Sequence, residues 1–410
     1  MTGQVGAVDA EAAARVAWST LIEPGDAAAG VLVTTLGAER SLALVTGKDP
    51  VRAVVAALQS SGGVDVTSID DVVASAVERW RPRFRRADAA RVLDAATAVG
   101  ASLVVPGDPD WPGGLDDLGV HAPMVLWRRG RPRGGQPPVV ERPCLSVVGA
   151  RSNTLAGAEA CAEITSAAAD AGCTTVSGGA YGIDAVAHRV AIAAGTPTIA
   201  VLAGGIDQLY PAGHVELLGN VGRQGMLLAE SPPGTPPTRW RFLARNRLIA
   251  ALGHAVVVVE AGARSGALNT AHHGAQLGRP VFAVPGAFTS PASVGCHRLV
   301  ADGVAQLAVH PQDPVRAAVA VHHGGDPKDL SAPLTSAIVD PEVVRVVDAL
   351  GRRPVTVVDV AERSGLSVAA ATDALALAEL QGIVERRTDG WVLGAAGRTG
   401  TTGRVTGRRA

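Results

Sequence analysis

Short apolar runs alternate with longer helical stretches across the middle of the chain. Such runs, bounded by glycine or small polar residues, are typical of parallel strands buried on both faces of a sheet. The runs lie at residues 145–149, 174–178, 198–205, 225–230, 255–262 and 280–286. The stretches between them, such as 155–171, are long enough for crossover helices. The pattern therefore predicts an α/β fold with a six-stranded, doubly wound parallel sheet that binds ligands outside the carboxyl ends of its strands.

The residues before this sheet have a different pattern. Alanine-rich runs within 10–100 predict helices, which are interrupted at Pro24-Gly25 and Gly62-Gly63. We therefore expect a helical N-terminal domain over residues 1–105. Residues 127–143 are rich in glycine, proline and arginine and predict an irregular linker. Its arginines are either solvated or a basic strip that contacts DNA.

A third pattern follows a break at residues 321–333, which we expect to be a linker. Residues 334–394 hold three helical stretches and a short hairpin, which is the order of a winged helix. The helices are expected at 341–350, 357–363 and 368–381, and the hairpin at 383–392. Residues 395–410 carry arginines among glycine and threonine without any acid, so they predict a disordered tail.

Length, charge and cysteine usage limit the classes of function. A chain of 410 residues is too long for one ordinary domain, and 47% hydrophobic residues exclude a mostly disordered chain. Because 37 Lys and Arg balance 38 Asp and Glu, affinity for nucleic acid has to come from local clusters. The four cysteines lack zinc-motif spacing, so we expect buried thiols and no metal. Without an export segment or a long apolar run, we expect a cytoplasmic protein with no membrane attachment.

The first two predicted strands end in glycine-rich loops that suit phosphate groups. Glycine lets the backbone approach a ligand, amides at a helix N-terminus favour an anion, and an arginine or an aromatic ring adds a charge or a stacking surface. The candidate residues are Gly149, Arg151, Ser177, Gly178, Gly179 and Tyr181. Neither loop has the spacing of a dinucleotide fingerprint or a P-loop, which disfavours those cofactors. The alternative is that these glycines serve packing alone.

Asp184 and His188 follow the second loop at a spacing of four residues. We interpret Asp184 as the N-cap of the next helix, and His188 as a polar side chain of that helix. The alternative is a catalytic Asp–His pair on one helical face.

A basic segment with aromatic residues lies at 239–247, where four arginines are interleaved with Trp240 and Phe242. Cations for phosphates and flat rings for bases are what a single-strand groove requires. The candidate residues from this segment are Arg241, Arg245, Asn246 and Arg247. The alternative is that the arginines pair with acids such as Glu230 and Glu260.

The fifth predicted strand is followed by Ser265 and Gly266 at the start of another helix. Their amides are suited to a phosphate or a base edge.

Six segments in fixed order carry a resemblance to a known family. They are 149–157, 177–189, 201–211, 245–253, 256–271 and 281–286. This set resembles the DNA-processing protein A family, also called DprA or Smf. The resemblance implies an extended Rossmann-like core over 106–320, with a leading segment at 106–143 and the sheet at 144–310. It also implies a C-terminal winged-helix-like domain over 334–394.

The resemblance implies a function as well as a fold. A member of this family would be a cytosolic homodimer that binds and protects single-stranded DNA and loads the RecA recombinase during natural transformation and recombination. It would need no cofactor and would not be an enzyme. By resemblance, the dimer surface lies near residues 297–304.

Individual residues match the family motifs. Arg151 is similar to a phosphate-binding arginine, and Ser177-Gly178, Arg245 to Arg247 and Ser265-Gly266 match three further motifs. Tyr181 departs from the family, because many members have arginine there; this removes one cation and offers a ring instead.

The predicted recognition helix of the winged-helix unit, 368–381, contains acids but no cation. Over residues 340–389, six arginines face nine acids. This balance favours a protein contact or an autoregulatory dock over major-groove binding, while Arg386 and Arg387 in the wing are placed to touch a DNA backbone.

A rival interpretation is a nucleotide hydrolase of the lysine-decarboxylase-like (LOG) Rossmann type. That family carries a PGGxGTxxE motif, whereas the corresponding segment 260–271 lacks its PGG opening and its glutamate. Glu260 or Glu230 would then have to supply the carboxylate for glycosidic cleavage.

Overall fold

The computed structural model describes residues 9–61, 69–130, 141–325, 341–351, 353–380 and 382–394. The chain separates into two compact units, Met1–Leu330 and Ser331–Ala410. The predicted break at Gly62-Gly63, most of the two predicted linkers and the predicted tail at 395–410 lie outside the described residues.

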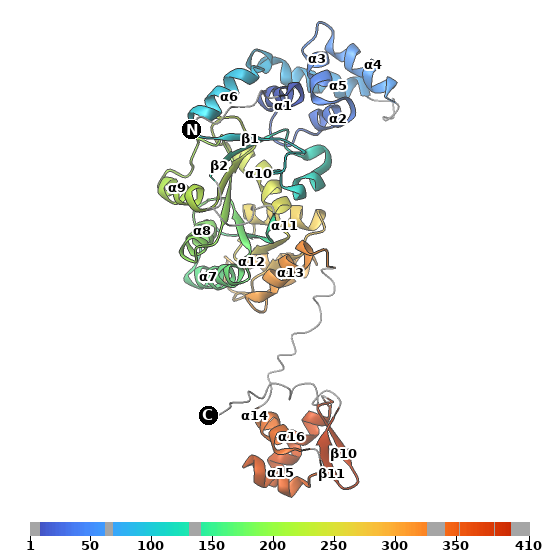
Figure 1. Cartoon of the computed structure of the whole chain (residues 1–410), viewed down its shortest axis with the longest axis vertical. Coiled ribbons are helices and arrows are strands. Elements are labelled where there is room, and N and C mark those ends of the chain that lie inside the picture. Colours follow the sequence, from blue (N-terminus) through green and yellow to red (C-terminus); the bar gives the residue numbers. More distant parts are fainter. Residues whose placement is uncertain are drawn as a thin grey trace, which may run out of the picture. The chain divides into compact units, whose positions relative to one another are not determined.

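A nine-stranded sheet forms the centre of the first unit (Figure 1). Its strands are β1 Ser102–Val104, β2 Leu126–Arg129, β3 Cys144–Val148, β4 Thr174–Ser177, β5 Thr198–Leu202, β6 Met226–Ala229, β7 Ala255–Val258, β8 Val281–Ala283 and β9 Gln306–Leu307. They lie in the order β1-β2-β6-β5-β4-β3-β7-β8-β9. All neighbours are parallel except β1 with β2 and β2 with β6. The predicted α/β class is confirmed, and β3 to β8 are the six predicted strands.

The prediction of an irregular linker from residue 127 is wrong at its start. Trp127 and Arg128 belong to β2, which pairs antiparallel with β6. The side chain of Trp127 is 0% exposed and packs in the core. Arg128 is also buried and forms an ion pair with Asp110 at 2.5 Å. Trp127 and Arg128 thus form part of a strand, although the stretch is rich in glycine, proline and arginine, because the strand buries the Trp127 side chain in the core.

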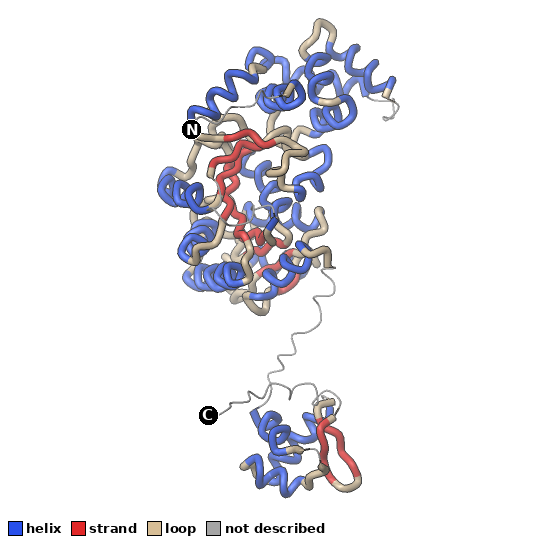
Figure 2. The backbone as a smooth tube through the Cα atoms, in the orientation of Figure 1, coloured by secondary structure: helices blue, strands red, loops and turns tan. Residues whose placement is uncertain are grey.

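Helices cover both faces of the sheet, as a doubly wound fold requires (Figures 1 and 2). One face packs against α7 Leu155–Asp170, α8 Ile183–Ala193, α9 Val215–Gln224 and α13 Gln312–His322. The other packs against α10 Arg239–Leu252, α11 Gly266–Gln276 and α12 Val294–Ala301. Successive strand residues alternate between the two cores, since Leu145 joins one and Cys144 the other.

The N-terminal residues are helical, as predicted. They form α1 Ala10–Leu21, α2 Ala27–Leu36, α3 Ala38–Val45, α4 Pro50–Ser60, α5 Ile69–Trp80, the 3-10 helix η1 Arg81–Arg86 and α6 Ala89–Ala98; a second 3-10 helix, η2 Gly113–His121, follows β1. Asp9 caps α1 by accepting from the amide of Ala12 at 2.6 Å. The rings of Trp18 and Trp80 pack edge to face at 5.1 Å. These helices share one apolar core with β2, β5, β6 and α9, which fixes them against the sheet.

No single helix within the described ranges is long and apolar enough to cross a membrane; α2 and α3 together pass that test only as a pair bent by 120°.

The second unit is a winged helix, as predicted. It contains α14 Pro341–Ala349, α15 Val357–Ser364, α16 Val368–Leu380 and the hairpin of β10 Val384–Arg387 with β11 Gly390–Leu393. Gly365 ends α15 in the left-handed region at φ 67°, a conformation that glycine adopts without strain. In the wing, the guanidinium of Arg386 lies 5.8 Å from the ring centroid of Trp391.

Candidate nucleic-acid interface

A groove of about 1010 Å³ lies at the carboxyl ends of β3, β4 and β7. It is lined by the loops that follow these strands and by residues of α10 between Arg239 and Ile249. Helix α10 begins beside the groove because Thr238 caps it, accepting from the amide of Arg241 at 3.3 Å. This is the edge of a doubly wound sheet at which ligands bind.

Arg151 lies in this groove, where the sequence placed it. It is exposed, and its guanidinium carbon lies 5.1 Å from the ring centroid of Phe242. The ring of Tyr210 packs against Phe242 at 5.5 Å. A cation stacked on one ring beside a second ring is suited to a phosphate and its neighbouring base.

Three exposed arginines line the groove without an acidic partner among the described residues. They are Arg151, Arg239 and Arg264. Arg239 and Arg264 were not among the residues predicted from the sequence, although both lie in segments named there. Whether an arginine has a carboxylate nearby depends on the tertiary structure, so the sequence alone did not identify them.

Arg245 also lines the groove, but its side chain is buried and links two strand ends. Its Nη1 donates to the carbonyl of Gly178 at 2.8 Å and to that of Val201. Burial lowers the pKa of Arg245 to about 10, with Asp184 opposing that shift and Arg151 adding to it. The group therefore stays charged at neutral pH and joins the ends of β4 and β5.

Arg241 and Arg247 do not line the groove, contrary to the expectation that they meet phosphates. Arg247 forms an ion pair with Glu230 at 2.7 Å, and their side chains are only 6% and 10% exposed. Arg241 pairs with Glu23 at 2.9 Å. For these two arginines the structure supports the alternative of acidic partners.

The remaining candidate residues separate into two groups. Those that line the groove are Gly149, Asn246, Ser265 and Gly266. Ser265 caps α11 by accepting from the amide of Ala267 at 3.3 Å, and Asn246 donates to the carbonyl of Gly266 at 3.2 Å. The loop and α10 are thereby fixed to each other.

Ser177, Gly178, Gly179 and Tyr181 lie beside the groove and not in its lining. The Ser177 hydroxyl donates to the carbonyl of Val147 at 2.7 Å, which joins two strand ends. The Tyr181 ring is half exposed and packs against His214 at 4.5 Å. An added Cβ at Gly178 would collide with the Arg245 guanidinium, so this glycine makes room for the arginine.

Asp184 does not cap its helix, which corrects the interpretation from sequence. The N-cap of α8 is Gly182, and Asp184 lies inside the first turn. Its carboxylate accepts from the amides of Gly178 and Ala180 at 3.1 and 3.2 Å. Burial raises the pKa of Asp184, and the Arg245 charge opposes this. Asp184 therefore shapes the loop after β4.

His188 makes no hydrogen bond to Asp184, so the two do not form a catalytic pair. The Thr198 hydroxyl donates to the carbonyl of Thr175 at 2.9 Å, so His188 Nδ1 must donate to that hydroxyl at 2.8 Å. The side chain is 0% exposed. Burial, with Arg245 and His214, lowers the pKa of His188 from 6.5 to about 3.

We expect the stability of the protein to fall in acid because of this histidine. Below pH 6.5 the unfolded chain takes up a proton that the folded state excludes down to about pH 3, so the free energy of unfolding decreases as the pH falls through that window. The largest slope is about 1.4 kcal/mol per pH unit. His188→Asn keeps a donor for Thr198 but cannot titrate. Denaturant unfolding between about pH 7 and 5 should therefore give this variant a shallower slope; equal slopes would contradict the assignment.

The two carboxylates required by the hydrolase interpretation already accept hydrogen bonds. Glu260 accepts from the amide and the hydroxyl of Thr154 at 3.0 and 2.6 Å, and thereby fixes the start of α7. Glu230 accepts from Arg247 at 2.7 Å and from the Gly25 amide at 3.3 Å. Each of the two carboxylates thereby holds a neighbouring segment of the chain in place.

Among the described residues, no cluster of three or more His, Cys, Asp or Glu side chains is arranged to hold a metal ion.

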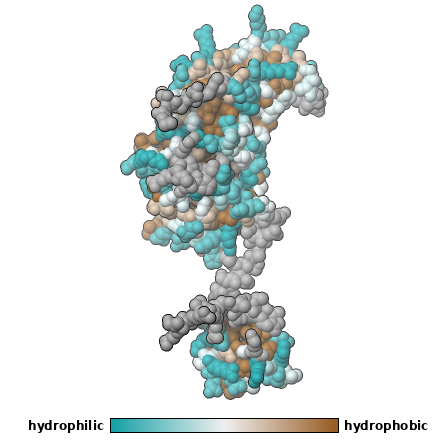
Figure 3. Space-filling view, viewed as in Figure 1, coloured by the Kyte–Doolittle hydropathy of each residue, from teal (hydrophilic) through white to brown (hydrophobic). Residues whose placement is uncertain are grey.

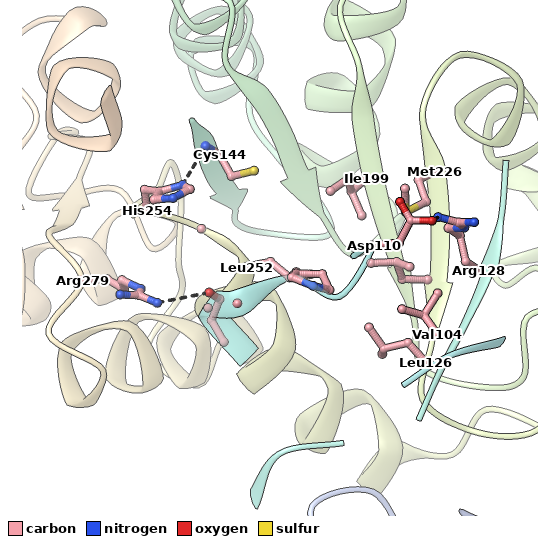
Figure 4. A pocket seen from close by; sticks show the side chains of 16 residues that line it. Val104, Asp110, Leu126, Arg128, Cys144, Ile199, Met226, Leu252, His254 and Arg279 are labelled. Atoms are coloured by element: carbon pink, nitrogen blue, oxygen red, sulfur yellow. Dashed lines mark hydrogen bonds and ion pairs between the residues drawn. The ribbon is translucent and has the colours of Figure 1, made fainter. Parts of the chain in front are cut away.

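A second, smaller cavity of about 80 Å³ lies near the amino ends of the strands (Figure 4). Leu126, Ile199 and Met226 contribute apolar side chains, and Arg128 lies beside Asp110 in the lining. This is the end of the sheet at which doubly wound folds do not bind their ligands, so the groove is the stronger candidate site.

Known proteins match this chain in sequence and in fold. A family model described as DNA recombination-mediator protein A matches residues 102–318, and a DprA winged helix domain model matches 330–390. A DNA processing protein DprA of Mycobacterium tuberculosis is 41% identical over 321 residues, covering 75% of this chain and 81% of the relative. That of Streptococcus pneumoniae is 36% identical over 206 residues, covering 50% and 70%. The solved structure of DprA from Streptococcus pneumoniae matches with a TM-score of 0.58 and 28% identity, over 74% of this chain and 96% of that one.

Proposed function

Because the chain belongs to the DNA recombination-mediator protein A family, we propose that it binds single-stranded DNA in the groove at the carboxyl ends of its parallel strands. The observation that carries this proposal is a groove lined by three exposed arginines, Arg151, Arg239 and Arg264, in which Arg151 stacks on the ring of Phe242. Unpaired cations attract phosphates, and an accessible ring offers a stacking surface to any base.

Recognition of this kind depends little on sequence. The arginines and loop amides contact the backbone, which positions the strand, while a π-face accepts every base. In a duplex the bases are already stacked on one another, so the Phe242 and Tyr210 rings have nothing to contact without unstacking a step. Preference for a single strand follows from this difference.

The finer parts of the proposed function follow from the family. We place the protein in the cytoplasm as a non-enzymatic mediator without a cofactor, which protects incoming single strands and hands them to RecA during DNA uptake and recombination. The family description, a recombination mediator, supports this role. On helix α16, which has no cation, a protein contact is favoured over a DNA groove.

A homodimer is supported by the open edge of the sheet. Strand β9 has no neighbour beyond it in the described chain, and Leu307 and Val309 are 47% and 65% exposed there. An open strand edge with exposed apolar side chains at and beside it is a surface that a second copy covers readily. It directly follows residues 297–304, where the resemblance places the dimer surface.

A binding experiment with labelled oligo-dT tests the proposed function. We expect the wild-type protein to bind a single strand at least tenfold more tightly than a duplex of equal length at the same salt concentration. The logarithm of affinity should fall with the logarithm of salt concentration with a slope of about −0.7 for each phosphate contacted. A slope near zero, or equal affinity for the two forms, would contradict the proposal.

A further inference from the structure

A second arginine cluster lies outside the groove, in the N-terminal helical region. Residues 79–86 read RWRPRFRR and contain five arginines, a higher density than the segment 239–247. They span the end of α5 and the whole of η1. Between these arginines there is no acid. Like charges at this density repel one another unless an anion is near.

Only two of these arginines have acidic partners among the described residues. Arg83 pairs with Glu23 at 2.7 Å, and Arg79 with Asp26 at 3.4 Å. The other three, Arg81, Arg85 and Arg86, are exposed and form no ion pair within the described chain. The hydrophilic side chains that project from the N-terminal helices are visible in the space-filling view (Figure 3). The cluster therefore presents an unneutralised positive surface.

The cluster adjoins the helix that lines the groove. Glu23 accepts from Arg83 of η1 and also from Arg241 of α10, at 2.7 and 2.9 Å. Arg241 lies two residues after Arg239, which lines the groove. The Glu23 carboxylate thus bridges η1 and the first turn of α10. In a 3-10 helix, side chains three positions apart lie on the same side, so Arg86 lies on the side of η1 that Arg83 presents to Glu23. Arg81 and Arg85 project from the other two sides of this helix.

We infer that Arg81, Arg85 and Arg86, which project from different sides of η1, make this helix a second phosphate-binding segment, which carries a single DNA strand beyond the groove over the N-terminal helices. The inference rests on the proposed function, because it extends the path of the same strand. A strand leaving the groove past Arg239 meets η1 next, and its phosphates supply the anions that the cluster lacks. A nucleic acid is favoured over an acidic protein because the cluster continues an interface already lined with cations and rings.

The test compares oligo-dT of two lengths, one of about six nucleotides that fills the groove and one of about twenty that extends beyond it. The variant Arg81→Ser/Arg85→Ser/Arg86→Ser should bind the short strand within about twofold of wild type and the long strand about tenfold or more weakly. Its salt slope on the long strand should become shallower by about 2, which corresponds to three phosphates at roughly 0.7 each. On the short strand, the salt slope of the variant should equal that of wild type.

A charge-matched control separates this effect from loss of net positive charge. The variant Arg40→Ser/Arg52→Ser/Arg189→Ser removes three exposed arginines that have no ion pair among the described residues. We expect it to bind both lengths like wild type. Equal losses in the two triple variants, or an η1 variant that binds the long strand normally, would overturn the inference. If the wild-type protein itself failed to bind the short strand, the groove and thus the proposed function would be refuted instead.

Discussion

Replacement of Arg151, Arg239 and Arg264 together by alanine is expected to weaken the binding of single-stranded DNA by about a thousandfold. Each guanidinium lines the groove without an acidic partner among the described residues, so each can make a charge-assisted contact to a phosphate. Such a contact contributes about 1.4 kcal/mol, or tenfold in affinity. Titration of a labelled dT oligonucleotide across a salt series measures the affinity and should also give a slope shallower by about 2.

Two controls make this result specific to the groove. The triple Arg→Lys variant at the same positions keeps the charge, so it should retain most of the salt slope while losing part of the affinity, because lysine lacks the planar fork. All three positions are exposed, so thermal unfolding should be unchanged in both variants. If the alanine variant bound DNA within about threefold of wild type, the groove would not be the DNA-binding site.

Arg247→Ala is expected to destabilise the protein by about 3–5 kcal/mol and to leave intrinsic DNA affinity nearly unchanged. The variant leaves the Glu230 carboxylate charged and buried without its cation. That carboxylate also accepts from the Gly25 amide, so the loop between α1 and α2 loosens as well. Denaturant unfolding at neutral pH measures the loss, and binding is measured well below the unfolding temperature.

The matched control removes both charges at once. Arg247→Met/Glu230→Leu replaces the buried pair by apolar side chains of similar volume and should recover most of the stability. If Arg247→Ala instead kept its stability but lost tenfold or more in DNA affinity, Arg247 would be a phosphate contact after all. That result would restore the expectation from sequence and would require the ion pair to open when DNA binds.

Helix α10 shows why charge clustering alone does not define a binding site. Its four arginines are close in sequence, yet Arg239 faces the groove, Arg241 and Arg247 pair with Glu23 and Glu230, and Arg245 donates to strand-end carbonyls. Their partners come from segments far away in the chain. The same helix thus pairs with Glu23 of the N-terminal region, links the carboxyl ends of two strands and contributes a cation to the groove.

The sequence by itself determined the α/β fold, the six central strands and the winged helix, because buried strands and amphipathic helices carry their pattern locally. It also located the loops after the strands, and hence Arg151, because parallel strands end at one edge of the sheet. Only the tertiary structure decided which arginines remain without a partner, that Asp184 shapes a loop and does not cap its helix, and that Trp127 belongs to a strand. Electrostatic pairing and burial depend on residues distant in sequence, so no local pattern contains them.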